Sequence, residues 1–172
     1  MTGHDGLKYA SEAVTILNNL AFYHSSKGNL ESALLLFYMA IFIEESAHGQ
    51  QTGVAMIMNN MAGIFKQKGL DAAAGDLYRT SLAILEKGLG ADDPKVALVL
   101  NNLASIYSFQ NDYSQAEASF KRSLAIKEKV FGAEHRSVAL TLNNLADLYI
   151  EMGQKNEADE LKKRVAAIQA KN

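Results

Sequence analysis

The side chains in this sequence that could do acid–base or metal chemistry are scattered along the chain. The four histidines are His4, His24, His48 and His135. No two of them stand four residues apart, as paired histidines of a helical metal site do, and no cysteine is present. The sequence also has no glycine-rich phosphate loop and no nucleophile elbow. We therefore expect a non-enzymatic protein with no metal and no cofactor.

Adjacent asparagines are the polar feature that recurs. The sequence LNNLA stands at residues 17–21, 100–104 and 142–146, and MNNMA stands at 58–62. Asparagine is a mediocre helix former, so a helix that keeps two of them invites a reason. Its amide both donates and accepts hydrogen bonds, and could pair with the backbone of an extended peptide.

The asparagine pairs belong to a longer repeat. The first asparagines of the pairs are Asn18, Asn59, Asn101 and Asn143, spaced 41, 42 and 42 residues apart. Ten residues after each stands a residue that tolerates a left-handed backbone: Gly28, Gly69, Asn111 and Gly153. Five residues further on comes an alanine each time: Ala33, Ala74, Ala116 and Ala158. The pattern predicts four helix–turn–helix units, at about 8–48, 51–90, 94–132 and 136–171, in a single domain 1–172.

The third unit shows the expected helix ends most clearly. Asp93 is a suitable N-cap and Pro94 suits the first helical position, so we predict a helix from about Pro94 to Gln110. A second helix is predicted from about Tyr113 to Val130.

The whole pattern resembles the tetratricopeptide repeat, in the 42-residue form found in kinesin light chains. The third unit, VALVLNNLASIYSFQNDYSQAEASFKRSLAIKEKVFG, is the most similar. The resemblance implies an all-α, right-handed superhelical solenoid whose first helices line a concave surface, and a role in binding other proteins. The end units depart from the pattern: His24 replaces an aromatic residue, and Lys162 replaces the aromatic of the last second helix. Such departures are expected in terminal repeats.

Helical geometry divides the first helices into two faces. At 100° per residue, Leu17, Leu20, Ala21 and His24 share a stripe that we expect to form the core. The asparagines lie on the opposite face, and the resemblance implies that this face lines a peptide-binding groove. Its predicted residues are Thr15, Asn18, Asn19, Phe22, Met56, Asn59, Asn60, Gly63, Leu98, Asn101, Asn102, Ser105, Leu140, Asn143, Asn144 and Asp147, with Lys66 nearby.

Two interpretations of the asparagines remain open. They could bind the backbone of a partner peptide, or they could bond one another and set the repeat spacing. In either case, Lys66 is the only cation near this face, which does not fit the lysine- and arginine-lined clamp that relatives use for a terminal carboxylate.

The second helix of the first unit has an unusual outer face. Later units carry polar or small residues there, such as Asp76, Arg79, Thr80 and Ala83. The first unit instead carries Leu35, Tyr38, Met39 and Phe42. An apolar patch of this kind predicts an interaction site. Its occupant would be a second copy of the chain, giving a homo-oligomer, or another protein, while coverage from within the chain is the remaining alternative.

The amino-acid composition is typical of a folded, soluble protein. The chain has 172 residues, with 48% apolar and 21% charged residues and a net charge of −2. The balance gives no basic surface for nucleic acid. The apolar run at residues 33–43 is too short to span a membrane, and no signal peptide is visible at the N-terminus, so we expect a cytoplasmic protein.

Overall fold

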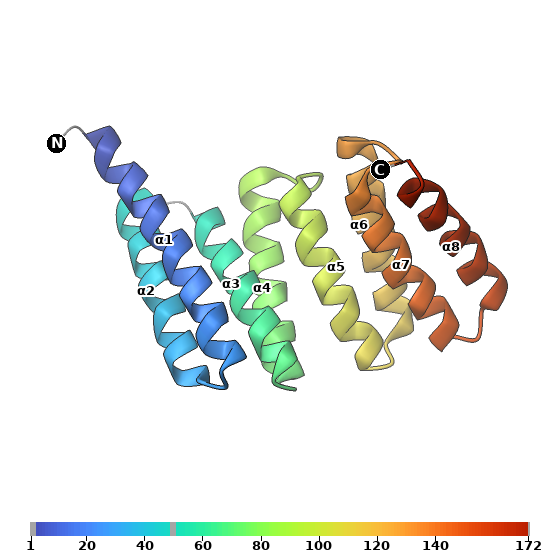
Figure 1. Cartoon of the computed structure of the whole chain (residues 1–172), viewed down its shortest axis with the longest axis horizontal. Coiled ribbons are helices and arrows are strands. Elements are labelled where there is room, and N and C mark those ends of the chain that lie inside the picture. The colour runs from blue at the N-terminus through green and yellow to red at the C-terminus, as the bar shows by residue number, and fades with distance from the viewer. Residues whose placement is uncertain (1–2, 49–50, 172) are drawn as a thin grey trace. The chain divides into compact units, whose positions relative to one another are not determined.

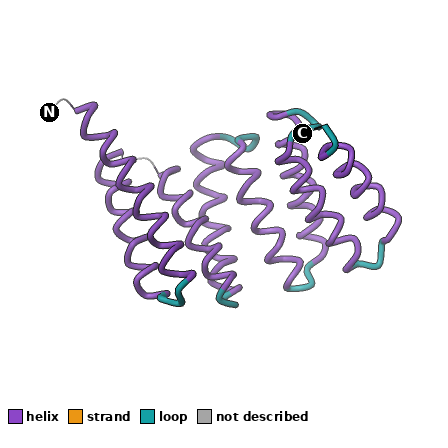
Figure 2. The backbone as a smooth tube through the Cα atoms, viewed as in Figure 1, coloured by secondary structure: helices purple, strands orange, loops and turns teal. Residues whose placement is uncertain are grey.

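The computed structural model describes residues 3–48 and 51–171, and in these residues it has eight α-helices and no strand (Figures 1 and 2). The helices are α1 (Gly3–Ser26), α2 (Leu30–His48), α3 (Gln51–Gln67), α4 (Asp71–Leu89), α5 (Pro94–Phe109), α6 (Tyr113–Phe131), α7 (Arg136–Glu151) and α8 (Lys155–Gln169). The all-α repeat predicted from the sequence is confirmed.

The helices pair into hairpins: α1 with α2, α3 with α4, α5 with α6, and α7 with α8. The chain divides into two compact units, Met1–Leu89 with the first two hairpins and Gly90–Asn172 with the last two. Within each unit, the first helix of the second hairpin packs against both helices of the first hairpin. The expectation of one domain over the whole chain stays a prediction.

The turns have the predicted backbone conformation. Gly28, Gly69, Asn111 and Gly153 have φ angles of 84°, 73°, 60° and 77°. This left-handed region ends a helix at low cost when glycine or asparagine occupies it. At the start of α5, the Asp93 carboxylate accepts a hydrogen bond of 2.7 Å from the Lys95 N–H, which confirms the predicted cap.

The row of alanines lets the helices of each hairpin approach closely. Ala33, Ala74, Ala116 and Ala158 are all buried. Small polar residues add a direct bond at the next turn: Ser81 in α4 donates to the Ala55 carbonyl at 2.7 Å, and Ser123 in α6 donates to the Ala97 carbonyl at 2.6 Å. Both hydroxyls are buried, so these hydrogen bonds satisfy groups that water cannot reach.

One core prediction is wrong. Leu20 was expected on the core stripe of the first helix, but it is 41% exposed. Its counterparts Met61, Leu103 and Leu145 are buried. Met61 is buried because it packs against the preceding hairpin in its unit, and Leu145 is buried in the same way. Among the described residues, α1 packs only against α2 and α3, so its opposite side stays uncovered.

Candidate functional site

The residues predicted to line a groove come from α1 and α3 in the first unit and from α5 and α7 in the second. They differ widely in exposure. The exposed ones are Thr15, Asn19, Phe22, Lys66, Leu98, Leu140 and Asp147. The half-buried ones are Asn18, Met56, Asn60, Gly63, Asn102, Ser105, Asn143 and Asn144. The buried ones are Asn59 and Asn101.

Four of the eight asparagines pair with one another in the same pattern in both units. In the first unit, Asn60 of α3 donates from Nδ2 to Oδ1 of Asn18 in α1 at 3.1 Å. In the second, Asn144 of α7 donates to Oδ1 of Asn101 in α5, also at 3.1 Å. The second asparagine of one repeat thus bonds the first asparagine of the preceding repeat. This geometry supports the interpretation that the pairs set repeat spacing, while peptide contact stays a prediction.

Several neighbours of these asparagines on α1 are bonded or packed within their own hairpin. Asn18 also donates to the Val14 carbonyl at 2.9 Å, and Thr15 donates to the Ser11 carbonyl at 2.9 Å. The ring of Phe22 meets Phe37 of α2 edge to face, with centroids 6.1 Å apart. The Thr15 hydroxyl and the Asn18 amide are thus each bonded to the backbone of α1, and the Phe22 ring packs on α2.

Lys66 lies in the last turn of α3. Partial burial lowers the pKa of its ammonium group, and the Asp71 carboxylate nearby acts in the opposite direction.

In the second unit, apolar side chains dominate the exposed part of the surface. Leu98 of α5 is 39% exposed, and Leu140 of α7, at the equivalent position one repeat later, is 56% exposed. The Ser105 hydroxyl donates a hydrogen bond of 3.2 Å to the Asn101 carbonyl of the same helix. Asp147 is exposed and lies 3.7 Å from the ammonium of Lys162.

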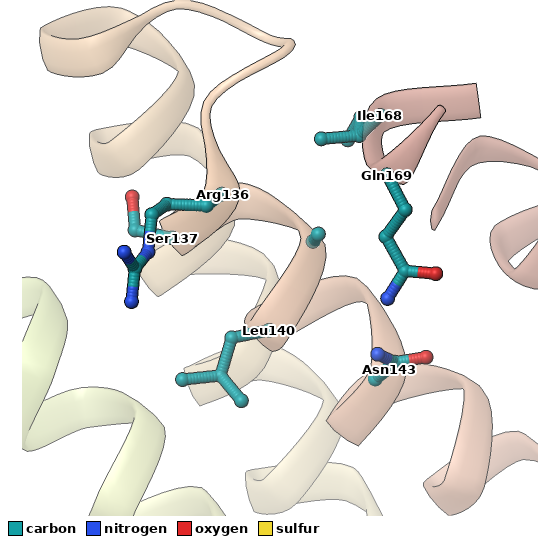
Figure 3. A pocket seen from close by; sticks show the side chains of 7 residues that line it. Arg136, Ser137, Leu140, Asn143, Ile168 and Gln169 are labelled. Carbon is teal, nitrogen blue, oxygen red and sulfur yellow. The ribbon is translucent and has the colours of Figure 1, made fainter. Parts of the chain in front are cut away.

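A pocket of about 490 Å3 lies between α7 and α8 (Figure 3). Leu140 and Asn143 line it from α7, and Ile168 and Gln169 line it from α8. Figure 3 shows the amide of Gln169 extending toward Asn143. Arg136 and Ser137, at the start of α7, complete the rim.

The apolar patch predicted on the second helix of the first unit is exposed. Leu35, Tyr38, Met39 and Phe42 on α2 are between 47% and 70% exposed. Among the described residues no other segment covers them. Four large apolar side chains on one helix face make a surface that monomeric proteins seldom leave in water.

The histidines that the structure describes have structural surroundings. His135 is the N-cap of α7, where Nδ1 accepts from the Ser137 N–H at 3.1 Å, and its ring stacks on Phe131. His24 is half-buried, and its Nδ1 is buried without a hydrogen-bond partner among the described residues. The side chains of His4 and His48 lie outside the described part of the chain.

Within the described ranges, no three acidic, histidine or cysteine side chains cluster so that they could hold a metal ion. The same ranges contain no helix with the length and hydropathy needed to cross a membrane.

A buried lysine is the polar group that sequence reasoning missed. Lys127 in α6 is buried, and its Nζ donates to Oγ1 of Thr141 in α7 at 2.7 Å. Burial lowers the pKa of this ammonium. The signal was present in the alignment of the repeats: the equivalent residue of the second repeat is Leu85, which is fully buried.

In the described residues, eight helices in matching hairpins, with left-handed turns between paired helices, define an α-solenoid repeat protein. The tetratricopeptide repeat model matches residues 53–129 and 120–171, and a second model of the same repeat matches 14–49. The chain belongs to the tetratricopeptide repeat family, and its repeats are of the kinesin-light-chain-like type. Members of this family generally mediate protein–protein interactions.

Solved structures show the same fold. BtubC (BKLC) from P. vanneervenii superposes with a TM-score of 0.82 at 21% identity, over 100% of this chain and 75% of that chain. Two crystal structures of a Podosopora anserina protein, assigned as a kinesin light chain with nearly identical TPR-like repeats, superpose with TM-scores of 0.77 and 0.76. Both are 25% identical to this chain and cover 92% of it and 76% of their own chain. No curated protein matches the sequence.

Proposed function

We propose that this chain is a non-enzymatic protein-binding module whose first-helix surfaces hold an extended segment of a partner protein. The observation that carries the proposal is the exposure of Leu98 and Leu140 at equivalent positions of successive first helices. Burying side chains of this size stabilises a complex by roughly 1.5–3 kcal/mol each at most.

The Asn143 amide beside Leu140 supplies a polar part of the proposed site. Asn143 is half-buried on α7, and an asparagine amide can pair with both the N–H and the C=O of a peptide. Asn101 and Asn144 bond each other instead, so their part in the site is to hold α5 and α7 in register.

A pull-down from cell extract tests this proposal. Leu98→Arg and Leu140→Arg should each reduce partner recovery about tenfold or more, because each places a charge in an apolar contact. Ala118→Arg, at an exposed position of α6, is the matched control and should recover the partner at the wild-type level. Equal recovery by all three variants would refute binding at this surface.

A second candidate function is assembly through the apolar patch on α2. Its carrying observation is the exposure of Leu35, Tyr38, Met39 and Phe42. We propose that two copies pack this face symmetrically, which makes the chain a scaffold subunit. Phe42→Glu or Tyr38→Glu should then convert a concentration-dependent dimer to monomer in light scattering. A dimer that persists in both variants would refute this interface.

A further inference from the structure

The side of α1 that faces away from α3 carries apolar residues that elsewhere in the chain are buried. Ile16, Leu20 and Tyr23 form one stripe on this helix and are 41–58% exposed. Their counterparts in α3 are Ile57, Met61 and Ile64, which are buried against Ala33, Phe37 and Ala40 of the preceding hairpin. In α7 the counterparts Leu145 and Leu148 are buried against Ala116 and Phe120.

In each unit, one hairpin contacts the first helix of the next hairpin, and this contact is called a joint below. The described units contain two joints: α1–α2 with α3, and α5–α6 with α7. The stripe on α1 is the surface that a first helix uses in a joint, although among the described residues α1 packs only against α2 and α3.

The asparagines of α1 and α7 that form no bond across a joint occupy the two complementary positions of such a bond. In both joints the second asparagine of the later helix donates to the first asparagine of the earlier one. Asn19 occupies the donor position on α1 and is exposed, and Asn143 occupies the acceptor position on α7 and is half-buried. Neither side chain has a hydrogen-bond partner among the described residues. One end therefore offers a donor and the other an acceptor.

The α7–α8 hairpin also has a space where the next first helix would sit. In the first unit, Glu44 of α2 lies directly against Gly53 near the start of α3. Gln169 is the counterpart of Glu44, and together with Asn143 it lines the pocket in Figure 3. The pocket is thus at the position that α3 fills in the first joint.

Some residues on the α1 face and on the α7–α8 face differ in type from their counterparts in the internal joints. The replaced residues on the two faces are chemically complementary to each other. In the second joint, Tyr149 donates to the Glu117 carboxylate at 2.8 Å. The counterparts of these two residues at the ends are His24 and Asp159, which again can donate and accept. An imidazole N–H can donate a hydrogen bond to a carboxylate oxygen.

A second pair of counterparts, beside the first, is also complementary. Leu148 packs with Phe120 in the second joint, and the counterparts at the ends are Tyr23 and Lys162. Lysine over a tyrosine ring is a favourable cation–π contact. A contact between two copies would thus bring His24 opposite Asp159 and Lys162 opposite Tyr23. Lys162 would then leave its exposed contact with Asp147 at 3.7 Å, and Tyr23 would gain a second ammonium group beside that of Lys27.

We propose that this chain associates head to tail: α1 of one copy docks on the α7–α8 hairpin of the next and continues the joint. The interface uses two different surfaces, so it is heterologous and leaves a free face at each end of every oligomer. It shares Asn19 and Asn143 with the surface predicted to bind a peptide and shares no residue with the α2 patch, and neither of those two functions has to be correct for it to exist.

Mixing two variants tests the proposal. Leu20→Lys spoils the α1 face and Asn143→Lys spoils the α7–α8 face, so each alone should have the mass of one chain by sedimentation velocity. An equimolar mixture should form a two-copy species, because one intact face of each kind remains. The unmodified chain should grow beyond two copies as its concentration rises.

Ala118→Lys adds the same charge to an exposed position of α6 and should assemble like the unmodified chain. All samples also carry Phe42→Glu, so that association through the α2 patch does not contribute to the measured mass. Far-UV circular dichroism checks folding, and Ile16→Lys and Lys162→Glu are the replacements if a first variant loses helix. The proposal is overturned if the unmodified faces give one-chain mass at every concentration, if growth stops at two copies, or if the mixture stays monomeric.

Discussion

The pair formed by Asn101 and Asn144 makes a quantitative prediction about stability. Asn101 is 6% exposed, and its Oδ1 accepts from Asn144 Nδ2 at 3.1 Å. A hydrogen bond of this kind contributes about 0.5–1.5 kcal/mol net, and a buried polar group left without its partner costs about 1–3 kcal/mol. Asn101→Ala and Asn144→Ala should therefore each lower the free energy of unfolding by about 1–3 kcal/mol.

The double variant separates the bond from everything else the two side chains do. If the amides act together, Asn101→Ala/Asn144→Ala loses less than the sum of the single variants, with a coupling energy of about 1 kcal/mol. Urea titration followed by circular dichroism measures all three free energies. Asn18→Ala combined with Asn144→Ala is the control, because the two residues belong to different pairs, and their effects should add within about 0.5 kcal/mol.

The result that refutes this reasoning is additivity within the Asn101–Asn144 pair. It would mean that the observed bond does not stabilise the fold. The companion measurement is partner recovery by the folded Asn101→Ala variant. Unchanged recovery together with lower stability identifies the pair as structural.

Three further changes probe groups buried in the fold. Burial raises the pKa of Tyr78 from 10.0 to about 12, so the folded protein holds the phenolic proton longer than the unfolded chain, and stability falls between pH 10 and 12 by about 2–3 kcal/mol. Tyr78→Phe should remove this fall in urea titrations, and an unchanged fall would contradict it. Burial lowers the pKa of Lys127 below 10.5, so the native state releases this proton first and stability rises with pH up to about 10.5. Lys127→Met should flatten that rise in melting temperature, whereas a wild-type slope would show that Lys127 is not its source. Gly63→Ala should stabilise α3 by about 0.5–1 kcal/mol, because the added methyl group meets the Tyr78 hydroxyl at an ordinary 3.6 Å; a loss of stability would contradict the predicted fit.

The repeat, its turns and its alanine row could be predicted because each depends on chemistry inside one hairpin. A residue at φ 84°, such as Gly28, is needed wherever two helices join by this turn. A small residue such as Ala33 is needed wherever they cross closely. These requirements return every 41 or 42 residues, so register alone identified them.

Features of the joints could not be predicted in the same way, because they depend on which hairpin is the neighbour. Leu20 has the same type and helical phase as Leu103 and Leu145, and nothing local shows that it is exposed while they are buried. Lys127 looks like a surface residue until its Nζ is seen on Thr141 of the next helix. The asparagine pairing likewise links residues 42 and 43 positions apart.

Under the proposed function, the pairing of the asparagines indicates which ligand the first-helix surface should prefer. An amide that already donates to another asparagine, as Asn144 does, has less capacity left for a peptide backbone. The leucines beside it have their apolar surface still in water. Most of the favourable free energy of binding would then come from burying Leu98 and Leu140, and the amides would fix the direction of the bound peptide. A partner segment rich in apolar side chains therefore fits this surface better than one recognised through its backbone alone.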